Sequence, residues 1–203
     1  MKQIEIVNTR TIRRIIRLIF VSFELTMCEF FSRKSRAMMV VLIEEMKDES
    51  WEAVRRIYTD GIATKNATFQ TESPEWEAWD QSHRKDCRLI ARIDNQIAGW
   101  AALSNVSSRC VYAGVAEVSI YMDPAFRGMG IGDQLMKQLI AESEKNGLWT
   151  LQAGIFPENK ASIALHLKNG FKILGIREKI GKLENVWRDT VLLERRSKVV
   201  GIE

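Results

Sequence analysis

The sequence lacks the residue patterns of disulfide-rich, metal-binding and repeat proteins. It has three cysteines in 203 residues, an odd number without the spacing of a metal site. This is typical of reduced thiols in a cytoplasmic protein. It also has no internal repeat and no low-complexity tract. A hydrophobic content of 46% over this length supports one sizeable domain rather than two. We expect no bound metal.

Long hydrophobic runs are also lacking, even in the most apolar segment near the start of the chain. Residues 15–31 are apolar but are interrupted by Arg17, Glu24 and Glu29. The segment is too short and too charged for a membrane span. No small-residue cleavage site precedes the basic residues 33–36, so a signal peptide is not favoured.

Charge divides the chain into an extension, residues 1–38, and a single domain, residues 39–203. Residues 1–39 carry eight Lys and Arg against three Asp and Glu, whereas the remainder is close to neutral. The basic character therefore belongs to the extension, and we expect no nucleic-acid binding by the domain. Two interpretations of the extension stay open. Translation starts at Met38 or Met39 and the extension is not native, or it is an amphipathic appendage.

The most informative segment is the glycine loop Arg127–Gly132. The alternating pattern of Ala116–Met122 before it indicates a strand, and Asp133–Asn146 after it has helical spacing with Gly147 as a stop. A glycine loop between a strand and a helix leaves free backbone N–H groups at the helix N-terminus, which can hold a phosphate. The loop therefore predicts a phosphate-bearing ligand; a glycine-rich turn without a ligand is the alternative.

Two well-known phosphate loops do not fit this segment. A P-loop needs a Lys directly after its last glycine, and Gly132 is followed by Asp133. A dinucleotide fingerprint spaces its glycines differently. The segment resembles the acetyl-CoA signature of the GNAT N-acetyltransferases, Arg/Gln-x-x-Gly-x-Gly/Ala, carried here by Arg127, Gly130 and Gly132.

A second matching segment lies downstream. Residues 151–156 indicate a buried strand, and Asn159 and Ser162 suit the start of a helix that ends at Gly170. In GNAT proteins an Asn-x-x-Ser/Ala segment opens a helix that ends in x-x-Gly-Phe. The resemblance implies that Asn159 contacts the pantetheine arm of CoA, while a plain helix cap is the alternative.

The remaining pattern also resembles the GNAT fold. This resemblance implies an α/β (α+β) domain with a mixed, mainly antiparallel sheet of about six or seven strands flanked by helices. A helix capped by Asp48 or Ser50 is expected to end at Gly61, and a short helix follows Pro74. The expected strands are 40–43, 88–93, 96–103, 115–122, 151–156, 172–179 and 186–193.

Within that superfamily the chain resembles the phosphinothricin N-acetyltransferase (PAT/Bar-like) group. The residues that carry this likeness are Ile57-Tyr58, 67–72, Tyr112, 116–121, His166 and 187–189. The resemblance implies transfer of an acetyl group from acetyl-CoA, by direct attack in a ternary complex, to a small amino-acid-like amine of the phosphinothricin or methionine sulfoximine type. It also implies a cytoplasmic homodimer. A protein N-terminal or lysine acetyltransferase and a non-catalytic acetyl-CoA sensor are the alternatives.

Two side chains are candidates for catalysis. Strand alternation places Glu117, Ser119 and Tyr121 on one face, and a carboxylate on an otherwise apolar strand is costly unless it is paired or used. The resemblance implies that Glu117 is the base acting through a water. His166 stands where many GNAT enzymes have a Tyr beside the thioester sulfur, and it could stabilise or protonate the CoA thiolate. The alternatives are a structural Glu and a surface His.

The residues expected to bind ligands fall into two sets. For CoA they are the backbone of Ile120, Tyr121 and Met122 beside pantetheine, the loop residues Arg127, Gly128, Met129, Gly130, Ile131 and Gly132, and Asn159 with Ser162. For the acceptor they are Phe69, Arg109 and Tyr112. Many members of the group have an Arg directly after the Tyr that matches Tyr112, where this chain has Ala113. Arg109 is the substitute closest in sequence for binding a carboxylate.

Overall fold

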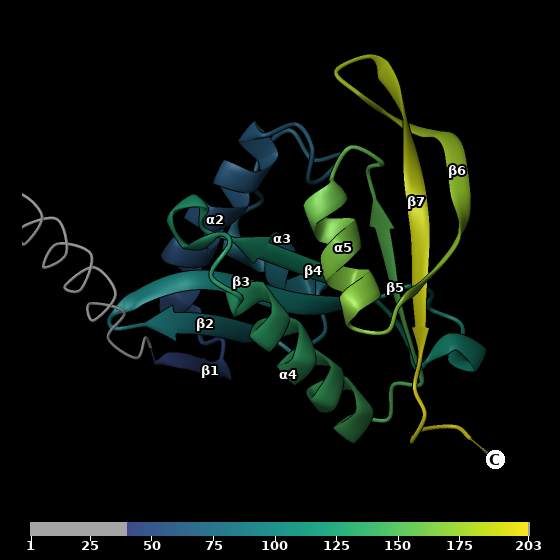
Figure 1. Cartoon of the computed structure of the whole chain (residues 1–203), viewed down its shortest axis with the longest axis horizontal. Helices are drawn as coiled ribbons and strands as arrows, with labels where there is room; N and C mark the ends of the chain where they lie inside the picture. Colours follow the sequence, from purple (N-terminus) through teal and green to yellow (C-terminus); the bar gives the residue numbers. More distant parts are fainter. Residues whose placement is uncertain (1–39, 203) are drawn as a thin grey trace, which may run out of the picture. The chain divides into compact units, whose positions relative to one another are not determined.

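The structure of the protein, a computed structural model, describes residues 40–202 (Figure 1). The predicted extension, residues 1–38, lies outside the described residues, as does Cys28. Of the other two cysteines, Cys87 is buried and Cys110 is exposed, and neither is in a disulfide. Burial raises the pKa of the Cys87 thiol to about 12, so this thiol is unreactive near neutral pH.

The domain is built on one seven-stranded sheet in the order β1-β2-β3-β4-β5-β7-β6. All neighbours are antiparallel except β4 and β5, which are parallel. The expected mixed, mainly antiparallel sheet is confirmed. The strands are β1 (Val41–Glu45), β2 (Leu89–Ile93), β3 (Gln96–Asn105), β4 (Val115–Met122), β5 (Thr150–Ile155), β6 (Lys172–Leu183) and β7 (Val186–Arg196).

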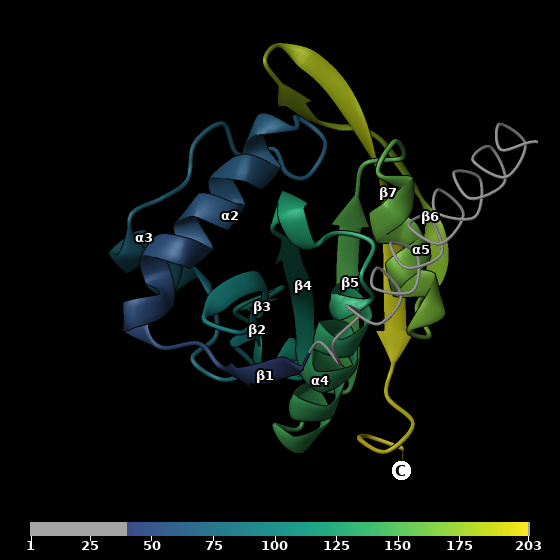
Figure 2. The same ribbon diagram turned by 60° about the vertical axis from the view of Figure 1, so that its left-hand side comes forward.

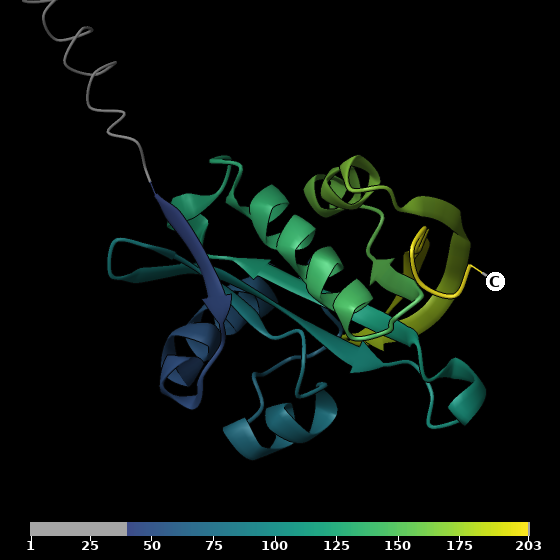
Figure 3. The ribbon, with the colours of Figure 1, turned by 90° about the horizontal axis from the view of Figure 1, so that it is seen from below.

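Helices cover both faces of this sheet. They are α2 (Trp51–Ala63), α3 (Trp76–Ser82), α4 (Ile131–Lys145) and α5 (Lys160–Lys168), with three short 3-10 segments, η1 (Asp48–Ser50), η2 (Cys110–Tyr112) and η3 (Pro124–Phe126). Figure 3 shows α4, in green, on one face and α2 and α3, in blue, on the other. β3 is therefore buried almost continuously from Ile97 to Leu103, as expected of a strand covered on both sides.

Each face has its own apolar core. Leu135, Met136 and Leu139 of α4 pack on one face with Val118 and Leu151. On the other face, Trp51, Val54 and Ile57 of α2 and Trp79 of α3 pack against Trp100 of β3. Alternation along β4 sends Val118 to the first core and Tyr121 to the second, which confirms the predicted faces of this strand.

The parallel pairing of β4 with β5 is short. Only three positions pair, Val115 with Thr150, Ala116 with Leu151 and Glu117 with Gln152. β4 then runs five residues further, to Met122, without pairing to β5, although it still pairs with β3. Figure 2 shows β4, β5 and β7 side by side with α5 beyond them. The sheet therefore opens on one side of β4 after Glu117.

Three expectations about local structure need correction. Gly61 does not end α2, which continues to Ala63; a Cβ on Gly61 would lie 2.7 Å from Cδ1 of Tyr121, so packing explains the glycine. Ser50 makes no side-chain cap, because η1 leads directly into α2. β6 extends to Leu183 across a β-bulge instead of ending near residue 179. No helix within residues 40–202 has the length and apolar character needed to cross a membrane.

Candidate active site

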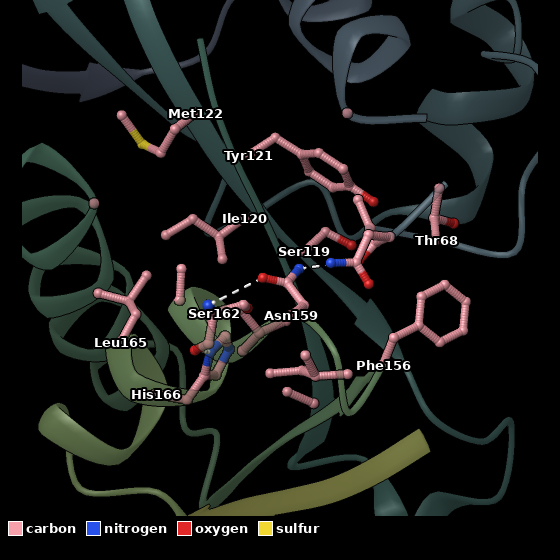
Figure 4. A pocket seen from close by; sticks show the side chains of 18 of the residues that line it. Thr68, Ser119, Ile120, Tyr121, Met122, Phe156, Asn159, Ser162, Leu165 and His166 are labelled. Atoms are coloured by element: carbon pink, nitrogen blue, oxygen red, sulfur yellow. Dashed lines mark hydrogen bonds between the residues drawn. The ribbon is translucent and has the colours of Figure 1, made fainter. Parts of the chain in front are cut away.

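A cleft of about 770 Å³ begins where β4 and β5 separate. It is lined by β4, the glycine loop, the start of α4, the end of β5, α5 and the loop after α2 (Figure 4). All of the predicted catalytic residues and most of the predicted CoA residues line it, comprising Glu117, Ile120, Tyr121, Met122, Arg127, Gly128, Gly130, Ile131, Gly132, Asn159, Ser162 and His166.

The glycine loop forms one end of this cleft. Gly128 and Gly130 have φ values of 77° and 78°, in the left-handed region that favours glycine, and α4 begins at Ile131. A Cβ on either glycine would meet nothing within 4 Å, so the backbone here is open to a ligand. The first N–H groups of α4 have no intrahelical acceptor and carry the positive end of the helix dipole. Met129 is half exposed and does not line the cleft.

An ion pair anchors the segment that leads into the loop. Arg56 Nη2 of α2 lies 2.6 Å from Oδ2 of the buried Asp123, whose Oδ1 accepts a hydrogen bond from the N–H of Ala125 at 2.8 Å. Burial acts to raise the pKa of Asp123, but the bonds from Arg56 and Ala125 lower it overall. The carboxylate therefore stays ionised and fixes the turn η3 that precedes Arg127.

A second carboxylate near the loop is neutralised by its neighbours. Asp133, in the first turn of α4, lies 2.9 Å from Lys137 Nζ and 3.0 Å from Lys168 Nζ. Asn169 Nδ2 also donates to it at 3.0 Å, and together these bonds hold the pKa of Asp133 well below its usual range. Asp133 thus joins α4 to α5, and the two ammonium groups balance its charge at the helix N-terminus.

Glu117 lies at the other end of the unpaired part of β4. It is the last residue of β4 that pairs with β5, and its side chain is exposed to the cleft. Its Oε1 faces Gly154 of β5, since a Cβ on Gly154 would stand 3.6 Å from it. Among residues 40–202 the side chain of Glu117 has no hydrogen-bond or ion-pair partner. Because the strands separate here, this carboxylate is exposed to solvent despite its central position in the sheet.

His166 is the most buried polar side chain of the cleft, at 2% exposure. Its Nδ1 lies 2.8 Å from the carbonyl oxygen of Ser162, which can only accept, so Nδ1 carries a proton. Burial lowers the pKa of His166, although the Ser162 bond opposes this shift. The ring is thus neutral near pH 7, and Nε2 is an unprotonated acceptor that has no partner within the described part of the chain.

Asn159 bridges the cleft. Its Oδ1 accepts a hydrogen bond from Ser162 N at 3.2 Å, which confirms the predicted cap of α5. Its Nδ2 donates at 3.1 Å to the backbone oxygen of Asn66, in the loop after α2. Both hydrogen bonds are drawn in Figure 4, which shows Asn159 between Ser162 and the α2 side of the cleft. A pantetheine amide that bonds to Asn159 Nδ2 would share it with Asn66.

The side of the cleft opposite α4 is aromatic and rich in hydroxyl groups. Phe69 packs edge-on against Phe156 with ring centroids 4.8 Å apart. The hydroxyl-bearing residues that line this side are Thr68, Ser119, Tyr121 and Thr190. Of these side chains, only Phe69 is predicted from the sequence to bind the acceptor. Alternation with Glu117 along β4 points to Ser119 and Tyr121, and Thr68 belongs to the segment 67–72 that resembles the PAT/Bar-like group. No sequence pattern points to Phe156 or Thr190.

Arg109 and Tyr112, the other two residues expected to bind the acceptor, do not line the cleft. They lie before β4, at η2, with the Arg109 guanidinium carbon 5.6 Å from the centroid of the Tyr112 ring. Both side chains are exposed. Within one chain the structure therefore does not bring them together with Glu117 and Phe69.

Residues 37–171 match the model of the acetyltransferase (GNAT) family. The chain is 33% identical to YwnH of Bacillus subtilis over 162 residues, 77% of this chain and 98% of the relative. It is 29% identical to the phosphinothricin N-acetyltransferase of Alcaligenes faecalis over 75% of this chain and 81% of that protein. It is also 29% identical to an L-methionine sulfoximine/L-methionine sulfone acetyltransferase of Pseudomonas aeruginosa, over 68% of this chain and 84% of that protein.

Solved structures give the same fold. An N-acetyltransferase of Staphylococcus aureus superposes with a TM-score of 0.72 at 30% identity, covering 77% of this chain and 98% of that chain. A phosphinothricin acetyltransferase of Sinorhizobium meliloti in complex with acetyl-CoA superposes with a TM-score of 0.73 at 24% identity, covering 81% of this chain and 92% of that chain.

Proposed function

Since the chain belongs to the acetyltransferase (GNAT) family and is an N-acetyltransferase, we propose that it acetylates the amine of a small, amino-acid-like acceptor. The observation that carries this proposal is the continuity of one cleft from the glycine loop to the Glu117 carboxylate. The cleft offers an anion site at one end and a hydrated base at the other. Relatives named for phosphinothricin and for methionine sulfoximine or sulfone support an acceptor of that type.

Acetyl-CoA is the proposed cosubstrate, and the chain has the groups to hold it. The open backbone at Gly128 and Gly130 and the free N–H groups of α4 suit the pyrophosphate, with Arg127 at the rim. The backbone of Ile120–Met122 is unpaired on the side that faces β5 and suits the pantetheine amides. When bound, acetyl-CoA supplies the activated acetyl group.

Glu117 is the proposed base. Most amines are protonated near pH 7, so one proton must leave before the nitrogen can attack. The hydrated carboxylate can take this proton through a water, and its negative charge also attracts the ammonium form of the acceptor. This role fits direct attack in a ternary complex, because both substrates would then occupy the cleft together.

His166 is proposed to relay a proton instead of acting as a ready-made acid. In the neutral tautomer Nε2 must first accept a proton, for example the second one released by the acceptor nitrogen. The ring can then give this proton to the departing CoA sulfur, and it ends the cycle neutral. The carbonyl of Ser162 holds Nδ1–H throughout, so Nε2 remains the nitrogen that accepts and returns the proton.

A homodimer in the cytoplasm completes the proposal. β6 is an edge strand, and it exposes apolar side chains that a second copy could cover, among them Ile173, Leu174 and Ile176, with Trp187 on β7. In Figure 1 the β6–β7 hairpin extends past the other strands of the sheet. If a partner's η2 reached the cleft, Arg109 and Tyr112 could still meet the acceptor. Light scattering of the purified protein tests the dimer.

The test is CoA thiol release from acetyl-CoA with a panel of amines. We expect turnover with L-methionine sulfone, L-methionine sulfoximine or phosphinothricin, and loss of turnover in Glu117→Gln with acetyl-CoA still bound. Turnover with peptides alone would favour a protein N-terminal or lysine acetyltransferase. Tight acetyl-CoA binding without turnover of any amine would favour a sensor and would contradict the proposal.

A further inference from the structure

The side chain of Tyr121 shares the acceptor side of the cleft with Glu117. Both project from the same face of β4, with Ser119 between them. Figure 4 shows the Tyr121 hydroxyl directed toward Thr68, away from Met122 and Leu165. The backbone of Tyr121 faces the proposed pantetheine path, so its side chain is free for a different ligand.

Three neighbours hold the ring in place. Trp100 stacks on it with centroids 4.8 Å apart and planes inclined by 17°, and Tyr58 meets it edge-on at 4.8 Å. Its other neighbour is Gly61 of α2, where a Cβ would lie 2.7 Å from Cδ1 of the Tyr121 ring. A glycine inside a helix costs about 1 kcal/mol relative to alanine. The fold therefore accepts a helix defect at a position that leaves room for this ring.

The hydroxyl of Tyr121 is a permanent donor. Burial raises the pKa of Tyr121 far above its usual value, and the nearby Tyr58 and Glu117 add to this shift. Burial also raises the pKa of Tyr58, and the nearby Thr68 hydroxyl acts to lower the pKa of both tyrosines. The hydroxyls of Tyr58, Thr68 and Tyr121 thus lie close together, and Thr68 and Tyr121 line the cleft.

The charged side chains of the cleft are placed so that an oxygen of the acceptor would be bound by these hydroxyls. Among the described residues that line the cleft, Arg127 and Lys168 are the Arg and Lys side chains. Arg127 belongs to the glycine loop, and Lys168 is paired with Asp133 of α4. Both serve the CoA end, while Glu117 attracts the amine at the acceptor end. A hydrogen-bond acceptor elsewhere on the same small molecule then faces neutral donors.

We infer that the Tyr121 hydroxyl, supported by Thr68 and Tyr58, is a specificity-determining donor that binds an oxygen of the acceptor. This inference rests on the proposed function. The oxygen belongs to a carboxylate or to a sulfonyl-type side chain, and both are acceptors without a proton of their own. The site therefore selects amines that carry such an oxygen over amines of similar size that lack one.

The test compares Tyr121→Phe with Thr59→Val, a control in which an exposed residue of α2 outside the cleft loses its hydroxyl. Four amines distinguish the two kinds of oxygen. L-methionine sulfone carries both a carboxylate and a sulfonyl group, and L-methionine carries only the carboxylate. 3-(Methylsulfonyl)propan-1-amine carries only the sulfonyl group, and n-butylamine carries neither. We expect Tyr121→Phe to lower kcat/KM for L-methionine sulfone by about tenfold, the usual effect of one lost hydrogen bond. The KM for acetyl-CoA and the rate with n-butylamine should not change.

The pattern over the amines identifies the oxygen. A loss with L-methionine but not with the sulfonyl amine assigns the carboxylate, and the reverse assigns the sulfonyl group. Equal losses with all four amines, or the same loss in Thr59→Val, would overturn the inference. Titration of tryptophan fluorescence with L-methionine sulfone gives a second measurement, because Trp100 stacks on Tyr121. If Tyr121→Phe binds L-methionine sulfone as tightly as the wild type does, the inference is overturned. If the wild type binds L-methionine sulfone more tightly than the variant but does not acetylate it, only the proposed function is overturned.

Discussion

A β-carbon on Gly181 would lie 2.9 Å from Cε1 and 3.0 Å from Cζ of Phe69. The ring of Phe69 thus lies in space that a glycine leaves open on β6, and its other side packs on Phe156. Phe69 and Phe156 line the cleft, but Gly181 does not. The width of the acceptor side is therefore set in part by a residue of the β6–β7 hairpin.

Replacing Gly181 by alanine should push Phe69 toward the acceptor. Overpacking of this kind costs about 1–3 kcal/mol, so we expect kcat/KM for the acceptor to fall by about tenfold. The KM for acetyl-CoA should stay the same. Gly175→Ala is the matched control on the same strand, because a Cβ there meets nothing within 4 Å. Equal losses in both variants would contradict the contact with Phe69 as the cause.

Glu117→Gln should lose about 10²–10⁴-fold in kcat near pH 7, the range expected for removal of a general base. The loss should shrink at high pH, where more of the amine is already neutral. Stopped-flow or thiol-release rates across pH measure this, with acetyl-CoA affinity determined in parallel. Glu77→Gln, an exposed carboxylate on α3, should behave as wild type. A full rate at pH 7 in Glu117→Gln would exclude the base assignment.

Asp123→Asn should weaken acetyl-CoA binding, although Asp123 itself does not line the cleft. The variant removes the charge that pairs with Arg56 and leaves an amide oxygen for the N–H of Ala125. Because Arg56 is half exposed, we expect a stability loss of about 1 kcal/mol. The KM for acetyl-CoA should rise severalfold while the acceptor KM changes little. Asp60→Asn, which removes the exposed partner of Arg56, is the control; an equal effect there would assign the result to Arg56 alone.

Stability should fall as the pH is lowered below about 6.5, the unfolded pKa of histidine. Burial lowers the pKa of both His83 and His166 in the folded protein, so the unfolded chain takes up protons first. The stabilisation is complete above that pH and declines on acidification, by up to about 1.4 kcal/mol per pH unit for each histidine. Urea denaturation at pH 7.0 and 5.5 measures the decline. His166→Gln should reduce it, and an unchanged pH dependence in that variant would contradict a neutral, buried His166.

Much of the fold follows from local sequence patterns. Alternation along 115–122, the glycine loop and the helical spacing after it predict β4, the loop and α4 at their observed places. Asn159 and Gly170 also mark the ends of α5 as expected, with Gly170 at a φ of 84°. These features are encoded within a few residues, so a single sequence can report them.

Features that depend on distant residues could not be predicted in this way. The local sequence predicts that Gly61 ends a helix, because its contact with Tyr121, sixty positions further along the chain, leaves no local pattern. The hydration of Glu117 depends on where β4 and β5 cease to pair, which no local pattern encodes. Closeness in sequence to Tyr112 favours Arg109 as an acceptor-binding residue, but both lie at η2 outside the cleft. Tertiary geometry decides each of these cases.

The short pairing between β4 and β5, over three positions, affects how stable the protein is in the cell. They are the only ladder between the four-stranded half β1–β4 and the three-stranded half β5–β7 of the described sheet. A cosubstrate bound between the halves adds contacts that the unfolded chain cannot make, and it stabilises the folded state in proportion to the logarithm of its concentration. Resistance to proteolysis, and with it the abundance of the enzyme, would then follow the supply of acetyl-CoA.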